Sequence, residues 1–305
     1  MRKPYEIVVP LFNDEDNLVN LLDSLIGVGI SPSDVLVSMS GPRGHVDELV
    51  GKYGFRLIYS ARKLTPSVAR NLGARQSHGD YIVFLDSDIL VTPQWKQALD
   101  DITHDHKTRL VGETYEISQS PHWIEKNWFS YIRKRERTYL NGGNIIVAAE
   151  MFESLDGFDE ALETGEDLDL CTRARKKGVI PEFNEQLVVH HEGNPKSIIQ
   201  FIKREKWHAK GDLGSVSAFF ESPVMLAAAL YGLILVFAVL VVVFGAFEWA
   251  LGSILLLLTL PFLLTVYKLK GTGANLFKSS IIMHFYLLGR GFALAESFLP
   301  NGQRR

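Results

Sequence analysis

The sequence of 305 residues is poor in three features that define large classes of proteins. It has a single cysteine, Cys171, which cannot form an internal disulfide, and this agrees with a reducing cytosolic environment. Its formal net charge of −3 gives no argument for nucleic acid as a partner. No long apolar run precedes Pro10, so we do not expect a signal peptide. The sequence therefore excludes a disulfide scaffold and predicts a cytoplasmic globular part.

Hydrophobic residues are abundant but unevenly distributed along the chain. Up to about Gly214 polar and apolar residues are mixed, over a length that can enclose a full core. From Pro223 onward the sequence becomes strongly apolar. We therefore expect a globular domain over residues 1–215 and a membrane region over residues 216–305.

The globular region alternates between the two regular patterns of secondary structure. Strands are predicted over residues 6–11, 34–38 and 55–59, with helices between them, which is typical of an α/β domain. The continuous apolar run at residues 81–85 predicts a fully buried strand of a parallel sheet.

Asp86 and Asp88 follow this buried run directly. Ligands of open α/β sheets bind at the carboxyl ends of the strands, and two aspartates there offer hard oxygen ligands to Mg²⁺ or Mn²⁺. The alternative is a solvated turn that caps the next helix. These residues alone do not separate the two interpretations.

Two other segments could approach a ligand. Arg70 lies on a predicted helix with small residues at Ala69 and Gly73, so its guanidinium could bind a phosphate or a carboxylate; an arginine on a solvated helix face is the commoner case. Gly142 and Gly143 precede another apolar run, and paired glycines allow the backbone to approach a ligand closely.

Acidic residues and histidines follow later in the chain. Glu166 and Asp167 begin a predicted helix, where acids also favour the helix dipole, so a catalytic carboxylate is one of two explanations. His190 and His191 end a predicted strand and are either ligands of a metal or phosphate, or structural residues.

The order of these motifs resembles that of the family 2 glycosyltransferases with the GT-A fold, of the membrane-anchored bacterial or archaeal type. The resemblance covers roughly residues 5–192. It rests on residues 9–15 (VPLFNDE), 69–73 (ARNLG), 84–88 (FLDSD), 142–144 (GGN), 157–160 (GFDE) and 165–167 (GED). It implies an α/β, Rossmann-like mixed sheet flanked by helices, followed here by a transmembrane helical segment.

The resemblance also implies roles for single residues. Asp86 and Asp88 match the family's Asp-x-Asp motif, which holds a divalent cation, Mg²⁺ or Mn²⁺, with His191 or His190 near a histidine that completes the metal site in some members. Asp167 matches the general base, with Glu166 beside it. The residues implied in nucleotide-sugar binding are Pro10, Asn13, Glu15, Ser38, Arg70, Asp86, Asp88, Gly143 and Asn144.

One position departs from the family pattern. Members usually carry an aspartate at the end of the second strand, where it reads the base, whereas residues 38–41 here are SMSG. The identity of the base is therefore open, and a UDP sugar is favoured over a GDP sugar only as a default.

The apolar C-terminal region predicts a transmembrane hairpin. Residues 222–247 and 249–267 contain no charged residue, and 26 helical residues would span about 39 Å. Lysines and arginines flank the hairpin and Glu248 lies in its turn, so the positive-inside rule places both ends in the cytoplasm at the inner membrane. A third apolar helix at residues 279–299 carries Arg290 and Glu296 and either spans the bilayer or lies at its interface.

The sequence thus predicts an inverting, metal-dependent glycosyltransferase. Its acceptor would be a membrane lipid-linked molecule, either a polyprenyl phosphate or a lipid-linked saccharide, in envelope or surface polysaccharide synthesis. The alternative is a catalytically inactive membrane module that binds a nucleotide sugar or serves as a scaffold. The presence of Asp86, Asp88 and Asp167 together favours the enzyme.

Overall fold

The computed structural model describes residues 3–105, 109–113, 115–132 and 138–298. Leu299, the expected end of the third apolar segment, and residues 300–305 of the predicted membrane region lie outside these residues. The chain forms two compact units. Unit 1 comprises Met1–Gln119 and Glu136–Asn194, and unit 2 comprises Ser120–Arg135 and Pro195–Arg305.

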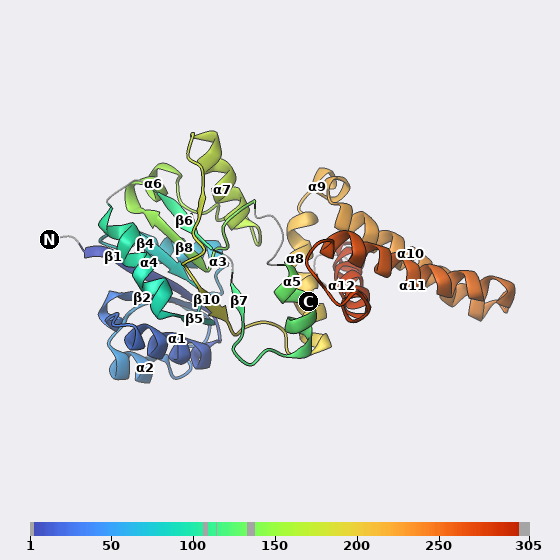
Figure 1. Ribbon diagram of the computed structural model, residues 1–305, viewed down its shortest axis with the longest axis horizontal. Coiled ribbons are helices and arrows are strands. Elements are labelled where there is room, and N and C mark those ends of the chain that lie inside the picture. The colour runs from blue at the N-terminus through green and yellow to red at the C-terminus, as the bar shows by residue number, and fades with distance from the viewer. Residues whose placement is uncertain (1–2, 106–108, 114, 133–137, 299–305) are drawn as a thin grey trace. The chain divides into compact units, whose positions relative to one another are not determined.

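Unit 1 is built around a mixed sheet flanked by helices (Figure 1). Its seven strands lie in the order β3-β2-β1-β4-β8-β6-β9, and the first four run parallel. The strands are β1 (Lys3–Leu11), β2 (Val35–Ser40), β3 (Arg56–Ser60), β4 (Gly79–Leu85), β6 (Leu110–Gly112), β8 (Asn144–Ala148) and β9 (Glu182–Phe183).

The position of β4 in this sheet decides where the polar motifs meet. β4 pairs with β1 in parallel, Phe84 opposite Val8, and with β8 antiparallel, Leu85 opposite Asn144. Because β8 runs in the opposite direction, its amino end lies at the carboxyl end of β4. The residues that follow β4 and those that precede β8 therefore share one edge of the sheet.

A second, three-stranded sheet brings a distant histidine to the same region. Its order is β5-β10-β7, formed by β5 (Ile89–Val91), β10 (Val189–His191) and β7 (Glu116–Ile117). His191 pairs with Ile89, one residue after the Asp-Ser-Asp turn. The short sheet thus brings His191, about a hundred residues later in the chain, next to Asp88.

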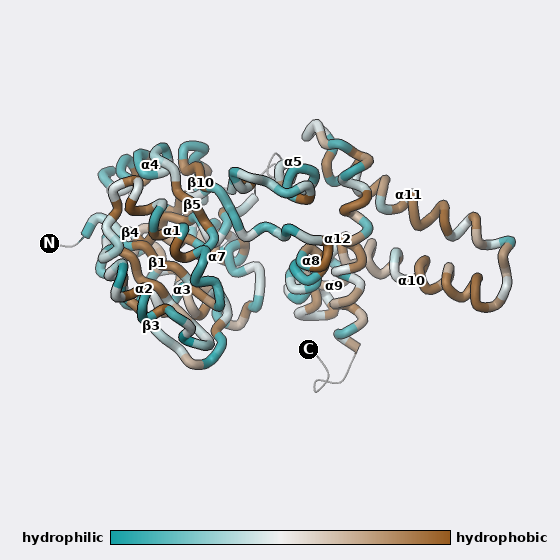
Figure 2. Tube along the Cα trace, turned by 90° about the horizontal axis from the view of Figure 1, so that it is seen from below, coloured by the Kyte–Doolittle hydropathy of each residue, from teal (hydrophilic) through white to brown (hydrophobic). Residues whose placement is uncertain are grey.

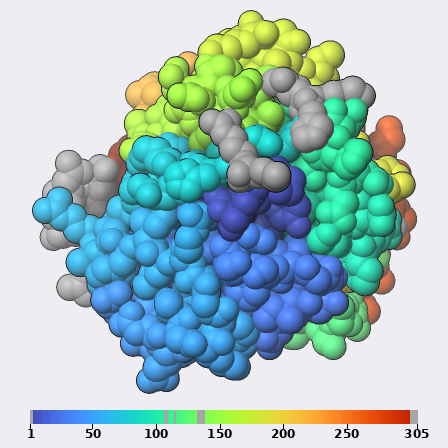
Figure 3. All heavy atoms as spheres, turned by 90° about the vertical axis from the view of Figure 1, so that its left-hand side faces the viewer, coloured from blue at the N-terminus to red at the C-terminus, as the bar shows by residue number. Residues whose placement is uncertain are grey.

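The helices of unit 1 bury the apolar faces that the sequence pattern predicts. In α1 the buried residues are Leu18, Leu21, Leu22 and Leu25. Helix α3 packs closely on the sheet at Gly73, where a Cβ atom would lie 2.3 Å from the Val8 side chain. These helices are α1 (Glu15–Gly27), η1 (Pro32–Asp34), α2 (Val46–Tyr53), α3 (Pro66–Arg75), α4 (Pro93–His104), α6 (Ala149–Ser154) and α7 (Glu166–Lys176). In Figure 3, residues of the first hundred positions, in blue and cyan, cover the lower half of one face.

All the regular elements among the described residues of unit 2 are helices. Its central helix, α12, packs against α8, α10 and α11. Both α10 and α11 are hydrophobic along most of their length (Figure 2). The elements are a π-helix, η2 (Glu125–Phe129), and η3 (Phe247–Trp249), with α5 (Ser130–Ile132), α8 (Ile198–Asp212), α9 (Val216–Glu221), α10 (Pro223–Val243), α11 (Ala250–Leu269) and α12 (Leu276–Ser297).

The boundary between the units differs from the one expected at residue 215. Helix α8 belongs to unit 2, and so does the segment Ser120–Arg135. The physical reason is a shared apolar core, in which Trp128 and Phe201 pack with Met283 and Tyr286 of α12. Composition changes only at Pro223, so it could not reveal this packing.

Candidate active site

A buried arginine joins two of the predicted site carboxylates. Arg70 of α3 is 4% exposed, and its Nη2 lies 2.6 Å from Asp86 Oδ1 while its Nη1 lies 2.7 Å from Glu166 Oε1. Burial acts to lower the pKa of Arg70, but Asp86 and Glu166 together raise it above its ordinary value. The guanidinium therefore stays charged and fixes the end of β4 relative to the start of α7.

The paired glycines let the backbone lie directly on this ion pair. A Cβ atom at Gly143 would lie 2.2 Å from Asp86 Oδ2, and one at Gly142 would lie 3.1 Å from the guanidinium carbon of Arg70. Gly143 N–H donates to the Tyr115 hydroxyl at 2.9 Å, and Gly143 C=O accepts from Asp86 N–H at 3.3 Å. Any side chain at Gly143 would displace the Asp86 carboxylate.

Asp88 lies beside His191 on the other side of the turn. The distance from Asp88 Oδ2 to His191 Nε2 is 3.4 Å. The imidazole stacks on the ring of Tyr115, with centroids 4.9 Å apart, and a Cβ atom at Gly193 would lie 1.7 Å from Asp88 Oδ2. His190, the other candidate, has its Nδ1 3.1 Å from the carbonyl oxygen of Ile117, which accepts a hydrogen bond from it. Because successive strand residues face opposite sides, the structure brings only His191 to Asp88.

Asp167 is the second residue of α7 and is held from two sides. Leu168 N–H donates to its Oδ1 at 2.8 Å, and Gly142 N–H donates to its Oδ2 at 3.2 Å. Burial, and then the neighbouring Glu166, raise the pKa of Asp167 from 3.8 to about 6. At neutral pH this carboxylate is ionised, but it binds a proton more readily than an ordinary aspartate. These are the properties of a general base.

The charge of the cluster suits a divalent cation. Asp86 and Glu166 bind the buried guanidinium of Arg70, and the charges of Asp86, Asp88 and Asp167 all act on the nearby Tyr115 hydroxyl. Among the described residues no group of three His, Cys, Asp or Glu side chains could hold a metal ion. The protein instead offers the Asp88 carboxylate and the His191 imidazole, a set compatible with Mn²⁺ or Mg²⁺, and Mg²⁺ commonly takes its other ligands from phosphate and water. The residues present therefore fit a cation that arrives with a phosphorylated substrate.

The loop after β1 lies against the Asp-Ser-Asp turn. Ser87 Oγ donates to Asp14 Oδ2 at 2.6 Å, so the middle serine ties the two segments together. Asn13 in this loop is exposed and has a positive φ of 51°, which few residues other than glycine adopt. Pro10 and Glu15 are half-buried beside it. The structure thus gathers the predicted nucleotide-binding loop and the acidic turn.

Two predicted contact residues lie inside the protein instead. Ser38, in the middle of β2, is 1% exposed and packs under Gly73. Asn144 is fully buried, and its amide accepts from Trp95 Nε1 at 3.0 Å and donates to the carbonyl of Leu187 at 3.0 Å. The structure does not bring these two side chains to the edge where the others meet.

Sequence analysis missed two residues that complete the cluster. Tyr115 bonds Gly143 and stacks on His191, and burial, followed by Asp86, raises its pKa well above 10, so its hydroxyl stays protonated. Asp14 lies in the motif at residues 9–15 but was not named as a site residue, yet its carboxylate accepts from the Ser87 hydroxyl. The region around Tyr115 has no clear pattern, whereas the four consecutive polar residues 13–16 were a signal that could have drawn attention to Asp14.

Comparison with known proteins identifies relatives of this site's scaffold. Residues 6–153 match the family model described as "Glycosyl transferase family 2". The pre-mycofactocin glycosyltransferase of Mycobacterium tuberculosis is 25% identical over 200 residues, which are 61% of this chain and 42% of that protein. The glycosyltransferase AglE of Haloferax volcanii is 21% identical over 221 residues, 68% of this chain and 72% of AglE. The chain thus spans less than half the length of the mycobacterial relative.

Solved structures share the fold. The mannosyltransferase PcManGT of Pyrobaculum calidifontis, in complex with GDP-Man and Mn²⁺, superposes with a TM-score of 0.59 at 14% identity, covering 96% of this chain and 89% of that one. Residues 1–349 of TarS from S. aureus superpose with a TM-score of 0.50 at 16% identity, covering 95% and 92%. The predicted GT-A-like mixed sheet flanked by helices is confirmed.

Proposed function

We propose, from the premise that residues 6–153 form a domain of glycosyltransferase family 2, that this chain transfers a sugar from a nucleoside-diphosphate sugar to a lipid-linked acceptor. The observation that carries the proposal is the placement of Asp167. A carboxylate with a raised pKa lies beside the Arg70–Asp86 pair, at the edge of the sheet where the resemblance expects the diphosphate.

The residues divide the chemical work between them. The acceptor hydroxyl loses its proton to Asp167 as its oxygen attacks the anomeric carbon, and the nucleoside diphosphate leaves. A single displacement of this kind inverts the anomeric centre. Glu166 is bound to Arg70, so its role is to raise the pKa of Asp167 and to hold α7 in place.

A divalent cation completes the proposal. Asp88 and His191 would hold Mg²⁺ or Mn²⁺, which when bound neutralises charge on the leaving diphosphate. Asp86 is engaged by Arg70, so it orients the turn and adds negative charge. Asn13 and Glu15 in the loop after β1, with the backbone at Pro10 and Gly143, are proposed to bind the nucleotide sugar.

The base of the donor nucleotide sugar is either uracil or guanine. The end of β2 and the residue after it, residues 38–41, carry no acid, which removes the usual recognition of the base and leaves the UDP sugar a default. The solved mannosyltransferase with a similar fold is in complex with GDP-Man. Both nucleotides therefore belong in the assay.

The acceptor is proposed to be lipid-linked because of the helical unit. The stretches Pro223–Val243 and Phe247–Leu269 are long and apolar enough to cross a membrane by length and composition, and only 17% of the most apolar window of each is buried. We expect these helices to form a hairpin in the plasma membrane with both ends in the cytoplasm. Polyprenyl phosphates and lipid-linked saccharides are the acceptors available at that face, in envelope or surface polysaccharide synthesis.

The third apolar helix is proposed to lie at the interface. In α12, Arg290 pairs with Glu205 and Asp212 of α8, and Glu296 pairs with Lys206. Arg290 and Glu296 are thus neutralised by α8, a helix that is itself rich in lysine and arginine. A charged helix pair of this kind is unfavourable in the bilayer centre and suits its surface.

The test is a transfer assay with purified chain. Radiolabelled UDP and GDP sugars are incubated with a membrane lipid extract and Mn²⁺, and the lipid fraction is counted; nuclear magnetic resonance of the product gives the anomeric configuration. We expect label in lipid with one donor, an inverted linkage, and no label in EDTA or with Asp167→Asn. Label that stays entirely in water-soluble products, or transfer at full rate in EDTA, contradicts the proposal.

A further inference from the structure

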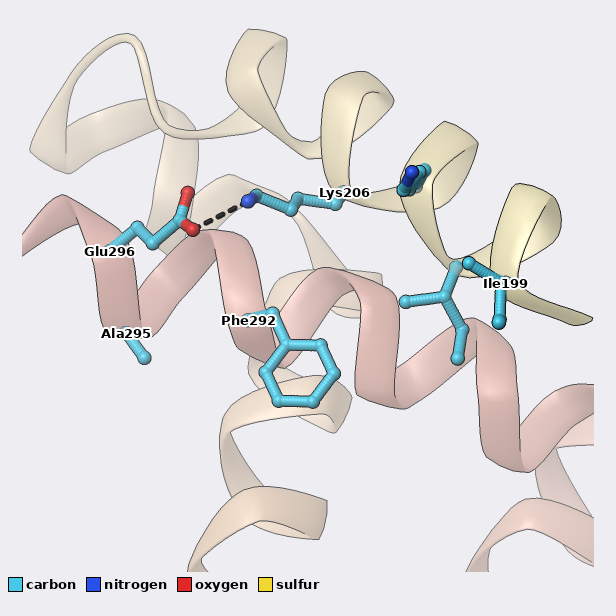
Figure 4. Close-up of a pocket in the computed structure, with 7 residues that line it drawn as sticks. Ile199, Lys206, Phe292, Ala295 and Glu296 are labelled. Atoms are coloured by element: carbon cyan, nitrogen blue, oxygen red, sulfur yellow. Dashed lines mark hydrogen bonds and ion pairs between the residues drawn. The ribbon is translucent and has the colours of Figure 1, made fainter. Parts of the chain in front are cut away.

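A pocket opens between α8 and α12 in unit 2 (Figure 4). Its volume is about 460 Å³, within the range of small-molecule sites. Three consecutive turns of α8 contribute to one wall, and the last turns of α12 contribute the other. The lining residues are Ile199, Ile202, Lys203, Lys206, Phe292, Ala295 and Glu296.

The apolar part of this pocket is open to the surroundings. Ile199 is 67% exposed and Phe292 is 51% exposed, while Ile202 is half-buried behind them. Figure 4 shows Ile199 on α8 and Phe292 on α12 among the residues that line the pocket. Large apolar side chains exposed beside a cavity indicate an apolar ligand or a membrane.

The charges at the rim are not balanced. Lys206 pairs with Glu296, the interaction drawn in Figure 4, so these two residues neutralise each other. Lys203 is exposed and forms no ion pair with any described residue. The pocket therefore carries one uncompensated positive charge. An ammonium group would find no free carboxylate among the lining residues, whereas an anion would find Lys203 and the remaining donors of Lys206.

A pocket with apolar walls and one lysine outside any ion pair suits a ligand that has an apolar part and an anionic group. The helix α12 that forms one wall also packs against α10 and α11, the two helices proposed to cross the membrane. Basic residues beside an interfacial helix attract anionic lipid headgroups, and long lysine side chains reach from an apolar surface to the headgroup level.

We propose that this pocket binds one anionic phospholipid of the bilayer, with the phosphate on Lys203 and Lys206 and the adjoining chain carbons on Ile199 and Phe292. The lipid anchors the α8–α12 pair and is distinct from the sugar acceptor. This inference rests on the membrane association proposed above and is independent of the transfer reaction.

The test is photocrosslinking of the full chain in phosphatidylcholine nanodiscs. A phosphatidylglycerol probe with a diazirine near the head of its chain is activated, and crosslinked peptides are identified by mass spectrometry. We expect labelling in residues 198–206 and 290–297, competed by unlabelled phosphatidylglycerol but not by phosphatidylcholine. Lys203→Gln and Lys206→Gln should each weaken competition about fivefold, as expected for loss of one lysine near an anionic surface. Lys210→Gln, a matched change on the same helix outside the pocket, should have no effect.

Three results would overturn the proposal. Equal labelling of these peptides by a phosphatidylcholine probe would show a non-selective apolar surface. Competition by soluble glycerol phosphate at the same concentration would show an anion site without a lipid. Unchanged labelling in Lys203→Gln and in Phe292→Ala would place the lipid elsewhere. No outcome of this test depends on catalysis. A failed transfer assay therefore says nothing against the lipid site, and crosslinking of the lipid says nothing in favour of sugar transfer.

Discussion

At the scale of single residues, the site depends on contacts between positions far apart in the chain. Arg70 binds Asp86 and Glu166, and the sequence predicted a phosphate or a carboxylate as its partner without choosing one. Glu166 lies 96 residues away, and only the sheet topology decides that it faces α3. The positions of Asp86 and Asp88 could be predicted because the apolar run before them fixes the strand end. The burial of Asn144 could not, since its amide partners, Trp95 of α4 and the carbonyls of Glu113 and Leu187, come together only after folding.

The first prediction concerns Asp167 and pH. Since its pKa is raised to about 6, the base is half protonated there, and the rate of transfer should fall as the pH drops through this value. Asp167→Asn should lower transfer by roughly 10²–10⁴-fold while nucleotide-sugar binding persists. A pH series of turnover with calorimetric binding measures both. Asp169→Asn, on the same helix and paired with Arg173, is the control and should keep most activity.

The same shift has a consequence for stability. A carboxyl group with a raised pKa in the folded state favours folding fully below its ordinary value of 3.8, and this contribution is lost as the pH rises through about 6. Asp167→Asn removes the buried charge, so the variant should melt at a higher temperature than the parent at pH 7. Equal melting temperatures at pH 7 would show that the charge costs nothing in the fold.

The second prediction separates the two histidines. His191 lies 3.4 Å from Asp88, whereas His190 bonds the carbonyl of Ile117. His191→Ala should raise the Mn²⁺ concentration for half-maximal transfer by at least about tenfold, an effect in the range seen when the surroundings of a metal site are altered. His190→Ala, the matched control, should leave this concentration unchanged. If the His190 variant instead shows the greater Mn²⁺ requirement, the metal role moves to that residue.

At the scale of elements, long apolar patterns were predictable and close helix crossings were not. The helix α10 forms within the predicted span of 222–247, and α11 covers most of the span 249–267 and extends two residues past it to Leu269, because uninterrupted apolar sequence favours a helix. In contrast, α8 crosses α12 at Gly289, where a Cβ atom would lie 2.8 Å from the carbonyl of Ile202. The sequence around Gly289, LLGRGF at residues 287–292, gives no sign of which helix this glycine meets.

The third prediction uses two glycines of the same helix. Gly289→Ala forces α8 away and should destabilise unit 2 by about 1–3 kcal/mol, as overpacking does. Gly291→Ala has no neighbour closer than 3.9 Å, so it should be neutral or stabilise by up to about 1 kcal/mol through helix propensity. Both changes add the same methyl group, and denaturation in detergent compares them. Equal effects would mean that the crossing tolerates a wider separation.

At the scale of the whole molecule, the order of motifs predicted the fold class, and composition predicted two regions. The membership of Ser120–Arg135 in unit 2 was not predictable, because this segment has no extended pattern and its partners lie 70 to 160 residues later. Trp128 and Ile124 are buried there at 1% exposure. Aromatic residues in an irregular stretch signal burial but do not reveal against what.

The fourth prediction tests the membrane topology. In a Cys171→Ser background, Glu248→Cys in the hairpin turn should react with an impermeant maleimide added to intact cells. Lys270→Cys, after the second helix, should react only after the membrane is permeabilised, because both ends of the hairpin are expected inside. Each variant serves as the control for the other. Labelling of Lys270→Cys in intact cells would place the loop before α12 outside and contradict the proposal.

The segment Ser120–Arg135 belongs to unit 2 although unit 1 precedes and follows it, and this limits how the protein can be cut into fragments. The chain passes between the units after Gln119, after Arg135 and after Asn194. A fragment that stops at Asn194 keeps Trp128 but lacks Phe201 and Tyr286. The side chain of Trp128 then loses the rings that cover it, and an exposed indole favours aggregation. By the same reasoning, one recombination joint cannot graft the catalytic part onto a different membrane module. Three joints, after Gln119, Arg135 and Asn194, must match at once.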